Sequence, residues 1–246
     1  MSETESPDGL CLLAFDTATR GCSAALWRAG GIEASRAAAM ERGQSEALLP
    51  MIEAVMNEAG AGYDDLDAIA VTIGPGAFTG LRIGLAAARG MALAAACPVI
   101  GVGTLEAVAR GVPESERSDR RILVVLDAKR ADHYAQTFAP DLSPLNEPRA
   151  LPAAAIAALV KDTPVVLAGD GAALIESALD GAGVDYIVST APGIPDAAAV
   201  AALAAARWSA GARPESLPRP LYLRAPDVSG PAARTAARTA AAAKPS

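Results

Sequence analysis

The sequence predicts a two-lobed α/β protein in which one plan of strand, hairpin, strand, helix, strand and helix occurs twice. Residues 121–138, "RILVVLDAKRADHYAQTF", mirror residues 10–27, "LCLLAFDTATRGCSAALW": each has an apolar strand ending in an aspartate, an Arg-containing turn and a second strand. Residues 163–179, "TPVVLAGDGAALIESAL", likewise mirror residues 66–84, "LDAIAVTIGPGAFTGLRIG": each has a strand, a Gly-x-Gly turn and a helix. Because both matches occur in the same order, we expect two related lobes with duplicated mixed sheets.

The first lobe is expected to begin with three strands. Residues 10–15 are continuously apolar, "DTATRG" forms a turn, and "CSAALW" and "IEASRAAA" follow as further strands separated by "AGG". A helix then follows in "SEALLPMIEAVMNEAGAG", which places Leu48, Ile52 and Val55 on one face, with Gly60 suited to a left-handed end. "LDAIAVTI" is a buried strand, and the helix after it runs to about Ala96.

The second half adds a helix in residues 196–211 and a last extended piece, "PLYLR", to the repeated plan. We place the N-terminal lobe with its partner-binding helices at residues 10–107 and the C-terminal lobe at residues 108–225. Residues 1–9 and the Ala- and Arg-rich residues 226–246 lack apolar periodicity, so a disordered N-terminus and a disordered basic tail are expected.

The composition excludes several classes of protein. With 246 residues, of which 52% are hydrophobic, the chain can bury a sizeable core without disulfides. Cys11, Cys22 and Cys97 lie in apolar runs without metal-site spacing, so reduced and buried thiols are expected. The acidic start resembles no signal peptide, and no run reaches the ~20 apolar residues of a membrane span. We therefore expect a cytoplasmic protein that does not contact membranes.

Charge is distributed unevenly along the chain. A net charge of -7 argues against a main body that binds nucleic acid by itself, because neutralising phosphates requires clustered Lys and Arg. The chain is basic from Arg219 onward, since this part has one acidic residue, Asp227, beside five basic ones. These are Arg219, Arg224, Arg234, Arg238 and Lys244. This pattern indicates a basic tail rather than a basic patch.

The glycine-rich block "TIGPGAFTGLRIGLAAARG", residues 72–90, could bind phosphate or pack closely against another segment. Its glycines fit neither the P-loop nor the G-x-G-x-x-G spacing, and Pro75 removes one N–H donor. In the following helix Gly80, Gly84 and Ala88 form a nearly side-chain-free stripe that another backbone can approach. The stripe could pack on the protein's own sheet or on a partner. The partner interpretation predicts that Gly84→Leu weakens the complex and leaves the isolated fold intact.

Candidate catalytic residues are few. "DTAT", residues 16–19, is similar to the Asp-x-Gly-Thr phosphate turn of actin-like and sugar-kinase ATPases, but Ala18 replaces the glycine. Asp16, Thr17, Thr19 and Asp127 are therefore candidates for a vestigial phosphate loop, or they bond their own turns. His133 is the single histidine and is expected at the surface or in a hairpin. A chain with one histidine has almost none of the residues that zinc sites or nucleophilic hydrolase sites require.

Six segments resemble the TsaB family, formerly YeaZ, across nearly the whole chain from Leu10 to Arg224. They are "LLAFDTATRGCSAALW", "LLPMI", "GPGAFTGLRIGLAAARGMALA", "VGTLEA", "LDAKRADHY" and "PLYLR". The resemblance implies the two-lobed actin/sugar-kinase-like (ASKHA) fold and a role in making N6-threonylcarbamoyladenosine in tRNA, at the adenosine next to the anticodon. It implies a non-catalytic scaffold for the catalytic paralogue TsaD, alongside the small ATPase TsaE, with tRNA contacted only indirectly and a homodimer when alone.

The resemblance also implies which residues meet the partner. TsaB-like chains pair through the two N-terminal helices, which correspond here to Leu48, Leu49, Ile52, Val55, Met56, Phe78, Gly80, Leu81, Arg82, Gly84, Leu85, Ala88 and Arg89. TsaD-like chains carry a His-x-Glu-x-His metal motif near the first of these helices. The matching stretch here, "ERGQSEALLP", has no histidine, and Gln44 stands where some relatives keep one. No cofactor is therefore expected on this chain, with ATP and metal on the partner subunits.

The residues of the chain disfavour two other functions. A peptidase is not expected, because the chain has no zinc motif and no histidine beside a nucleophile. The alternative is a nucleotide-dependent phosphotransferase or ATPase that uses Asp16 and Asp127 around a metal-bound phosphate. The missing glycine in "DTAT" and the absence of an adenine-type Gly-Gly turn disfavour it.

Overall fold

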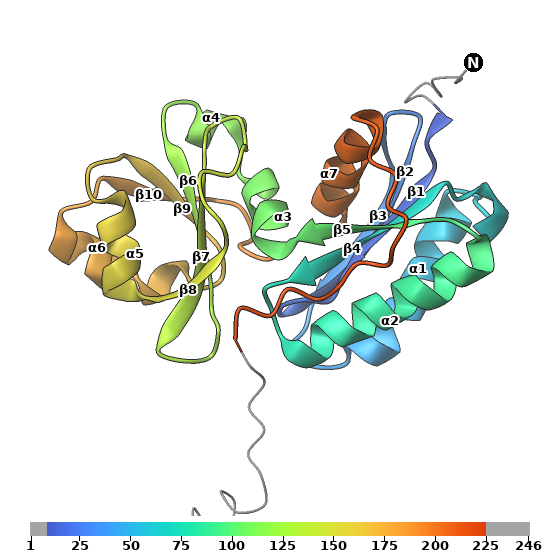
Figure 1. Ribbon diagram of the computed structural model, residues 1–246, viewed down its shortest axis with the longest axis horizontal. Helices are drawn as coiled ribbons and strands as arrows, with labels where there is room; N and C mark the ends of the chain where they lie inside the picture. Colours follow the sequence, from blue (N-terminus) through green and yellow to red (C-terminus); the bar gives the residue numbers. More distant parts are fainter. Residues whose placement is uncertain (1–8, 225–246) are drawn as a thin grey trace, which may run out of the picture.

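The computed structural model describes residues 9–224 as two lobes side by side, each built around a five-stranded sheet (Figure 1). The first sheet contains β1 (Leu12–Asp16), β2 (Gly21–Arg28), β3 (Gly31–Ala39), β4 (Ala68–Gly74) and β5 (Val99–Gly103). Their order is β3-β2-β1-β4-β5. The hairpin strands β1, β2 and β3 pair antiparallel, whereas β1, β4 and β5 are parallel.

The second sheet repeats this arrangement strand for strand. It contains β6 (Arg121–Leu126), β7 (Asp132–Phe138), β8 (Arg149–Pro152), β9 (Val165–Ala168) and β10 (Tyr186–Val188). The order from one edge is β8-β7-β6-β9-β10, with β6, β7 and β8 antiparallel and β6, β9 and β10 parallel. The two sheets therefore have the same order and orientation, and the predicted duplicated two-lobed α/β fold is confirmed.

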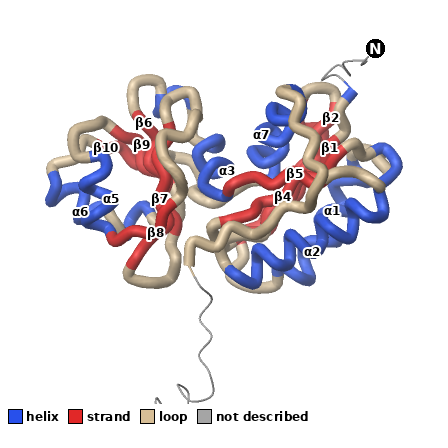
Figure 2. Tube along the Cα trace, viewed as in Figure 1, coloured by secondary structure: helices blue, strands red, loops and turns tan. Residues whose placement is uncertain are grey.

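Helices cover both faces of the first sheet. α1 (Gln44–Glu58) and α2 (Phe78–Ala95) lie on one face, and α7 (Ala197–Ser209) lies on the other (Figure 2). β1 shows why, because neighbouring strand residues point to opposite faces. Leu13 and Phe15 join the core under α1 and α2, whereas Leu12 and Ala14 join the core under α7.

The second lobe is covered more lightly. α5 (Ala153–Val160), the 3-10 helix η3 (Ala172–Leu174) and α6 (Glu176–Ala182) pack on one face of its sheet. α3 (Thr104–Gly111) packs on the other face through Leu105 and Val108 and also contacts α7, so it joins the lobes. Two short helices, η2 (Tyr63–Asp65) and α4 (Glu114–Arg117), complete the fold. Within residues 9–224, every helix is too short or too polar to span a bilayer.

The C-terminal part of the described chain returns to the first lobe. α7 packs on β1 and β2, and residues 217–224, which we call the strap, run along α2 toward the second lobe (Figure 1). This placement differs from the expected division at residue 107, because the apolar face of α7 fills the open side of the first sheet. Apart from Gly9, the segments expected to be disordered, residues 1–9 and 226–246, lie outside the described residues.

The structure confirms the local predictions for Gly60 and for two of the cysteines and corrects part of the prediction for His133. Gly60 has φ +59, the left-handed conformation expected after α1. All three cysteines are free, and Cys11 and Cys22 are buried as expected, whereas Cys97 is only half-buried. Of the two alternatives for His133, the hairpin is confirmed, because it lies in the β6–β7 hairpin, and the surface position is wrong. It lies on β7 with 6% of its surface exposed, because that strand is central enough for both of its faces to be covered.

Candidate functional site

The glycine-rich loop between β4 and α2 lies directly on the β1–β2 turn. The backbone N–H of Ala77 donates to the carbonyl of Ala18 at 2.7 Å, and the Thr17 hydroxyl donates to the carbonyl of Gly80 at 2.8 Å. A Cβ at Gly76 would lie 2.4 Å from the Ala18 carbonyl oxygen, and one at Gly80 would lie 2.0 Å from that of Thr17. The glycines therefore allow two backbones to approach closely within the chain.

The small-residue stripe belongs to the protein's own core. A Cβ at Gly84 would lie 2.8 Å from the Thr17 hydroxyl and 3.2 Å from a methyl of Val71, and Ala88 is fully buried. The sequence left two interpretations of the stripe open, and the structure supports the one in which it packs on the protein's own sheet. Gly84→Leu is consequently expected to destabilise the isolated fold, contrary to the partner interpretation.

Most of the residues expected at the partner interface are covered within the isolated chain. The covered residues are Leu48, Ile52, Val55, Met56, Gly80, Leu81, Gly84, Leu85 and Ala88. They face inward because α1 and α2 bury one stripe each against the sheet. Leu49, Phe78, Arg82 and Arg89 are exposed. For the nine covered residues the structure therefore corrects the assignment to a partner surface.

A different face of α2 is open to solvent. We call Ile83, Ala86, Gly90, Leu93 and Ala94 the outer face; Ile83 is half-buried and the others are exposed. Leu93 is 86% exposed, and, apart from the adjoining residues and backbone of α2 itself, no atom lies within 4 Å of a Cβ placed on Gly90. The outer face has no charged residue. Its spacing of three and four residues was visible in the sequence, but the glycine stripe on the opposite side of the same helix had the same period.

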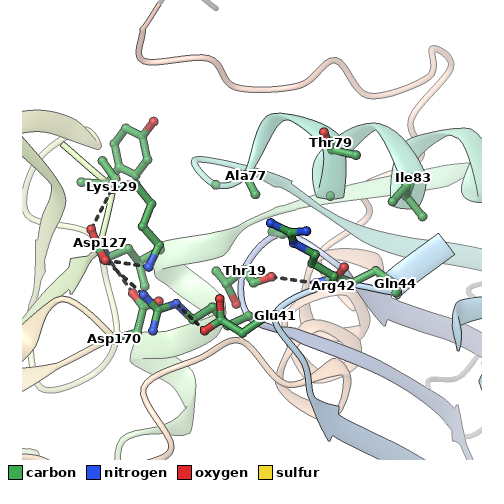
Figure 3. Close-up of a pocket in the computed structure, with 18 of the residues that line it drawn as sticks. Thr19, Glu41, Arg42, Gln44, Ala77, Thr79, Ile83, Asp127, Lys129 and Asp170 are labelled. Carbon is green, nitrogen blue, oxygen red and sulfur yellow. Dashed lines mark hydrogen bonds and ion pairs between the residues drawn. The ribbon is translucent and has the colours of Figure 1, made fainter. Parts of the chain in front are cut away.

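A cavity of about 410 Å³ lies between the lobes at the N-terminal ends of α1 and α2 (Figure 3). Its first-lobe wall includes Thr19, Gln44 and Thr79, and its second-lobe wall includes Asp127 and Asp170. Gln44 is held there because its side-chain amide donates to the carbonyls of Met40 at 3.2 Å and Thr19 at 3.4 Å. Gln44 therefore links the β1–β2 turn to the start of α1.

One ion pair, between Arg20 and Asp127, joins the two lobes across the cavity. Asp127 accepts from Arg20 of the first lobe at 3.3 Å and from Lys129 at 2.9 Å, and Arg20 also lies 3.5 Å from Glu41. The carboxylate of Asp170 accepts the backbone N–H of Asp127 at 2.9 Å. Burial raises the pKa of Asp170, although the hydrogen bond from the backbone N–H of Asp127 acts in the opposite direction. Asp127 therefore already has cationic partners from both lobes.

The candidate phosphate residues do not gather at one site. Asp16 is fully buried, and its carboxylate accepts the Thr72 hydroxyl at 2.6 Å and the N–H of Ala18 at 3.0 Å. Burial raises its pKa to about 7, although those hydrogen bonds act in the opposite direction. Thr17 is bonded to α2, so only Thr19 and Asp127 line the cavity. Among residues 9–224, no three His, Cys, Asp or Glu side chains gather closely enough to hold a metal ion.

Comparison with known proteins relates the chain to one group. Residues 28–147 match the family model described as "TsaD: tRNA N6-adenosine threonylcarbamoyltransferase". The chain is 38% identical to the tRNA threonylcarbamoyladenosine biosynthesis protein TsaB of Escherichia coli (strain K12), over 53% of this chain and 55% of that protein. It is 31% identical to an uncharacterized protein of Mycobacterium tuberculosis (strain H37Rv), over 88% of this chain and 93% of that one.

A solved structure is similar to this chain over a larger share of its length than the Escherichia coli protein. YeaZ from Pseudomonas aeruginosa superposes with a TM-score of 0.75 at 29% identity, covering 87% of this chain and all of that one. The sequence match to the Escherichia coli protein, in contrast, spans only about half of that protein's length. The similarity therefore extends over both lobes in structure, while in sequence it is strongest over part of the chain.

Proposed function

The chain belongs to the TsaB/YeaZ family, and on that premise we propose that it is a non-catalytic subunit of the machinery that makes N6-threonylcarbamoyladenosine in tRNA. It binds a TsaD-like catalytic paralogue and supports the reaction that this partner performs. The outer face of α2 carries the proposal, because it is apolar, uncharged and accessible, and Gly90 and Ala86 let another helix approach closely.

We assign the catalytic reaction to the partner because the Asp16 carboxylate is used in hydrogen bonds within this chain. Its carboxylate is enclosed and accepts bonds from Thr72 and the turn, so it is not available to bind a metal-bound phosphate in the cavity. The alternative of a phosphotransferase or ATPase gains no support from this arrangement. ATP and metal are accordingly assigned to the TsaD-like subunit and a TsaE-like ATPase.

The site residues of this proposal differ in part from those expected from the sequence. The exposed members of the expected interface, Leu49, Phe78, Arg82 and Arg89, lie on α1 or along the edges of the outer face. Two copies of the chain could pair through the same face when the partner is absent. A TsaD-like subunit then replaces the second copy, so homodimer and mixed complex compete.

The proposal is tested by light scattering on a sizing column. The chain is analysed alone and mixed with the TsaD-like protein of the same genome, with and without nucleotide. A mixed species that replaces any homodimer supports the proposal. If no mixed species forms under either condition, the proposed function is wrong.

Leu93→Glu is expected to weaken that complex roughly 10- to 100-fold. The side chain is 86% exposed in the isolated chain, so its replacement costs the lone fold little. Burying a leucine contributes about 1.5–3 kcal/mol, and a carboxylate in the same place would be desolvated without a partner. The dissociation constant of the mixed complex is measured by titration calorimetry.

Leu174→Glu is the matched control, because Leu174 is also an exposed leucine, at 53%, but lies on η3 of the second lobe. Both variants should unfold at the wild-type urea midpoint. Equal affinity of the two variants for the TsaD-like protein would exclude the outer face as the contact.

A further inference from the structure

The strap, residues 217–224, is fixed along α2 by a series of specific contacts. The N–H of Leu221 donates to the carbonyl of Ile73 at 2.7 Å, and Pro218 covers Gly101 of β5. The Arg89 guanidinium donates to the carbonyl of Pro218 at 3.4 Å, and Arg224 pairs with Asp132 of the second lobe. The strap and α2 therefore form one continuous surface that reaches from the first lobe to the second.

This surface is basic, in a chain whose net charge is -7. Neither α2 nor the strap contains an Asp or Glu, and together they contribute Arg82, Arg89, Arg219 and Arg224. The first three are exposed, and within residues 9–224 none of the three pairs with a carboxylate. The fold thus gathers basic residues from two distant parts of the sequence into a patch, which the sequence pattern had indicated only as a tail.

Aromatic rings lie within the same patch. Phe78 of α2 and Tyr222 of the strap have ring centroids 5.3 Å apart and are 36% and 38% exposed. The Arg82 guanidinium lies 3.7 Å above the Phe78 ring, and its Nε lies 3.4 Å from the Tyr222 hydroxyl. Exposed aromatic rings beside arginines that have no carboxylate partner are a combination that binds single-stranded nucleic acid, since bases stack on the rings and phosphates meet the cations.

We propose that the surface formed by α2 and the strap binds RNA directly, with Arg82, Arg89 and Arg219 on phosphates and Tyr222 under a base. The inference rests on the proposed function for the identity of the RNA, which is then the tRNA substrate. It replaces the expectation that tRNA touches this chain only indirectly. The surface adjoins the outer face, because Arg82 and Arg89 flank that face on α2. RNA held there would lie beside the proposed partner.

The test measures binding of a fluorescently labelled tRNA transcript to the full chain by anisotropy, at several salt concentrations. The double variant Arg89→Glu/Arg219→Glu is compared with Arg110→Glu/Arg149→Glu, which reverses the same number of exposed arginines away from α2 and the strap. We expect the first pair to weaken binding tenfold or more. Its slope of log affinity against log salt should fall by about 1.4, at ~0.7 for each single-strand phosphate contact.

A second variant pair tests the stacking contact. Tyr222→Ala should weaken tRNA binding about tenfold, because base–aromatic stacking commonly contributes that much or more, whereas Tyr222→Phe should retain wild-type binding. Circular dichroism and the urea midpoint show whether either variant has unfolded. The inference is overturned if wild-type chain does not bind tRNA, or if both arginine pairs weaken binding equally.

The mixed complex with the TsaD-like protein is measured for the same variants. Loss of that complex with tRNA binding unchanged would mean that the patch is a protein contact, which also overturns the inference. If tRNA binding depends on the patch but no mixed complex forms with the wild-type chain, the RNA site stands and the partner role fails. The two proposals can therefore fail separately.

Discussion

Gly80→Ala should destabilise the fold by about 1–5 kcal/mol, although Gly90→Ala in the same helix should stabilise it by about 0.5–1 kcal/mol. In a helix, alanine is favoured over glycine by about 1 kcal/mol, so both substitutions gain the same amount of helix propensity. The difference is the surroundings. A Cβ on Gly80 would lie 2.0 Å from the Thr17 carbonyl oxygen, whereas, apart from the adjoining residues and backbone of α2 itself, nothing lies within 4 Å of one on Gly90.

The clash at Gly80 cannot be relieved by turning a side chain. The obstacle is backbone, and the Thr17 hydroxyl binds the Gly80 carbonyl at 2.8 Å, so relaxation would also stretch a buried hydrogen bond. Overpacking alone costs about 1–3 kcal/mol, and a lost buried bond adds about 1–3 kcal/mol. Urea unfolding followed by circular dichroism measures both variants. Equal midpoints for Gly80→Ala and Gly90→Ala would contradict the close approach of α2 to the β1–β2 turn.

The same helix shows what the sequence could predict. Its period of three to four residues predicted a helix over the correct range and the presence of a close contact at Gly80 and Gly84. The period could not show which side faces the sheet, because α2 has small apolar residues both on its inner stripe and on its outer face. Ile83 and Ala86 follow the same spacing as Leu81 and Gly84, so only packing distinguishes them.

Other features depend on contacts between segments far apart in the chain. The internal repeat predicted the duplicated sheets, since each copy contains its own strands and turns. Asp16 ends β1 as expected, but its bond to Thr72 joins residues 56 positions apart. Likewise, nothing in "PLYLR" indicates that Tyr222 meets Phe78. Contacts of that kind are set by how the sheet and its helices assemble, and the local pattern does not contain them.

The unfolding free energy should fall between about pH 4 and pH 7 because of Asp16, and Asp16→Asn should remove that loss. Burial raises the pKa of Asp16 in the folded chain to about 7 from an ordinary value of 3.8. The folded chain therefore holds a proton that the unfolded chain has already released. Stability contributed by that proton is present below about pH 4 and is lost as the pH rises through 7.

The expected effect is large because the carboxyl group is fully buried. A shift of about three pKa units corresponds to roughly 4 kcal/mol, at 1.36 kcal/mol per unit. Asparagine keeps an oxygen that can accept the Thr72 hydroxyl and the Ala18 N–H, and its amide nitrogen replaces Oδ2, which has no hydrogen-bond partner. Any cost of burying that nitrogen is independent of pH. It therefore shifts the free-energy difference between variant and wild type by the same amount at every pH and leaves its slope against pH unchanged.

The measurement is urea unfolding of both proteins at intervals from pH 4 to pH 8. The free-energy difference between Asp16→Asn and wild type should rise with pH by up to about 1.4 kcal/mol per unit and level off above about pH 7. Comparing the two proteins cancels the titration of all other groups that the substitution leaves unchanged. A difference that stays constant with pH would mean that Asp16 is ionised in the fold throughout. Its carboxylate would then have a cationic or solvent contact, and the case for a phosphate-site role would reopen.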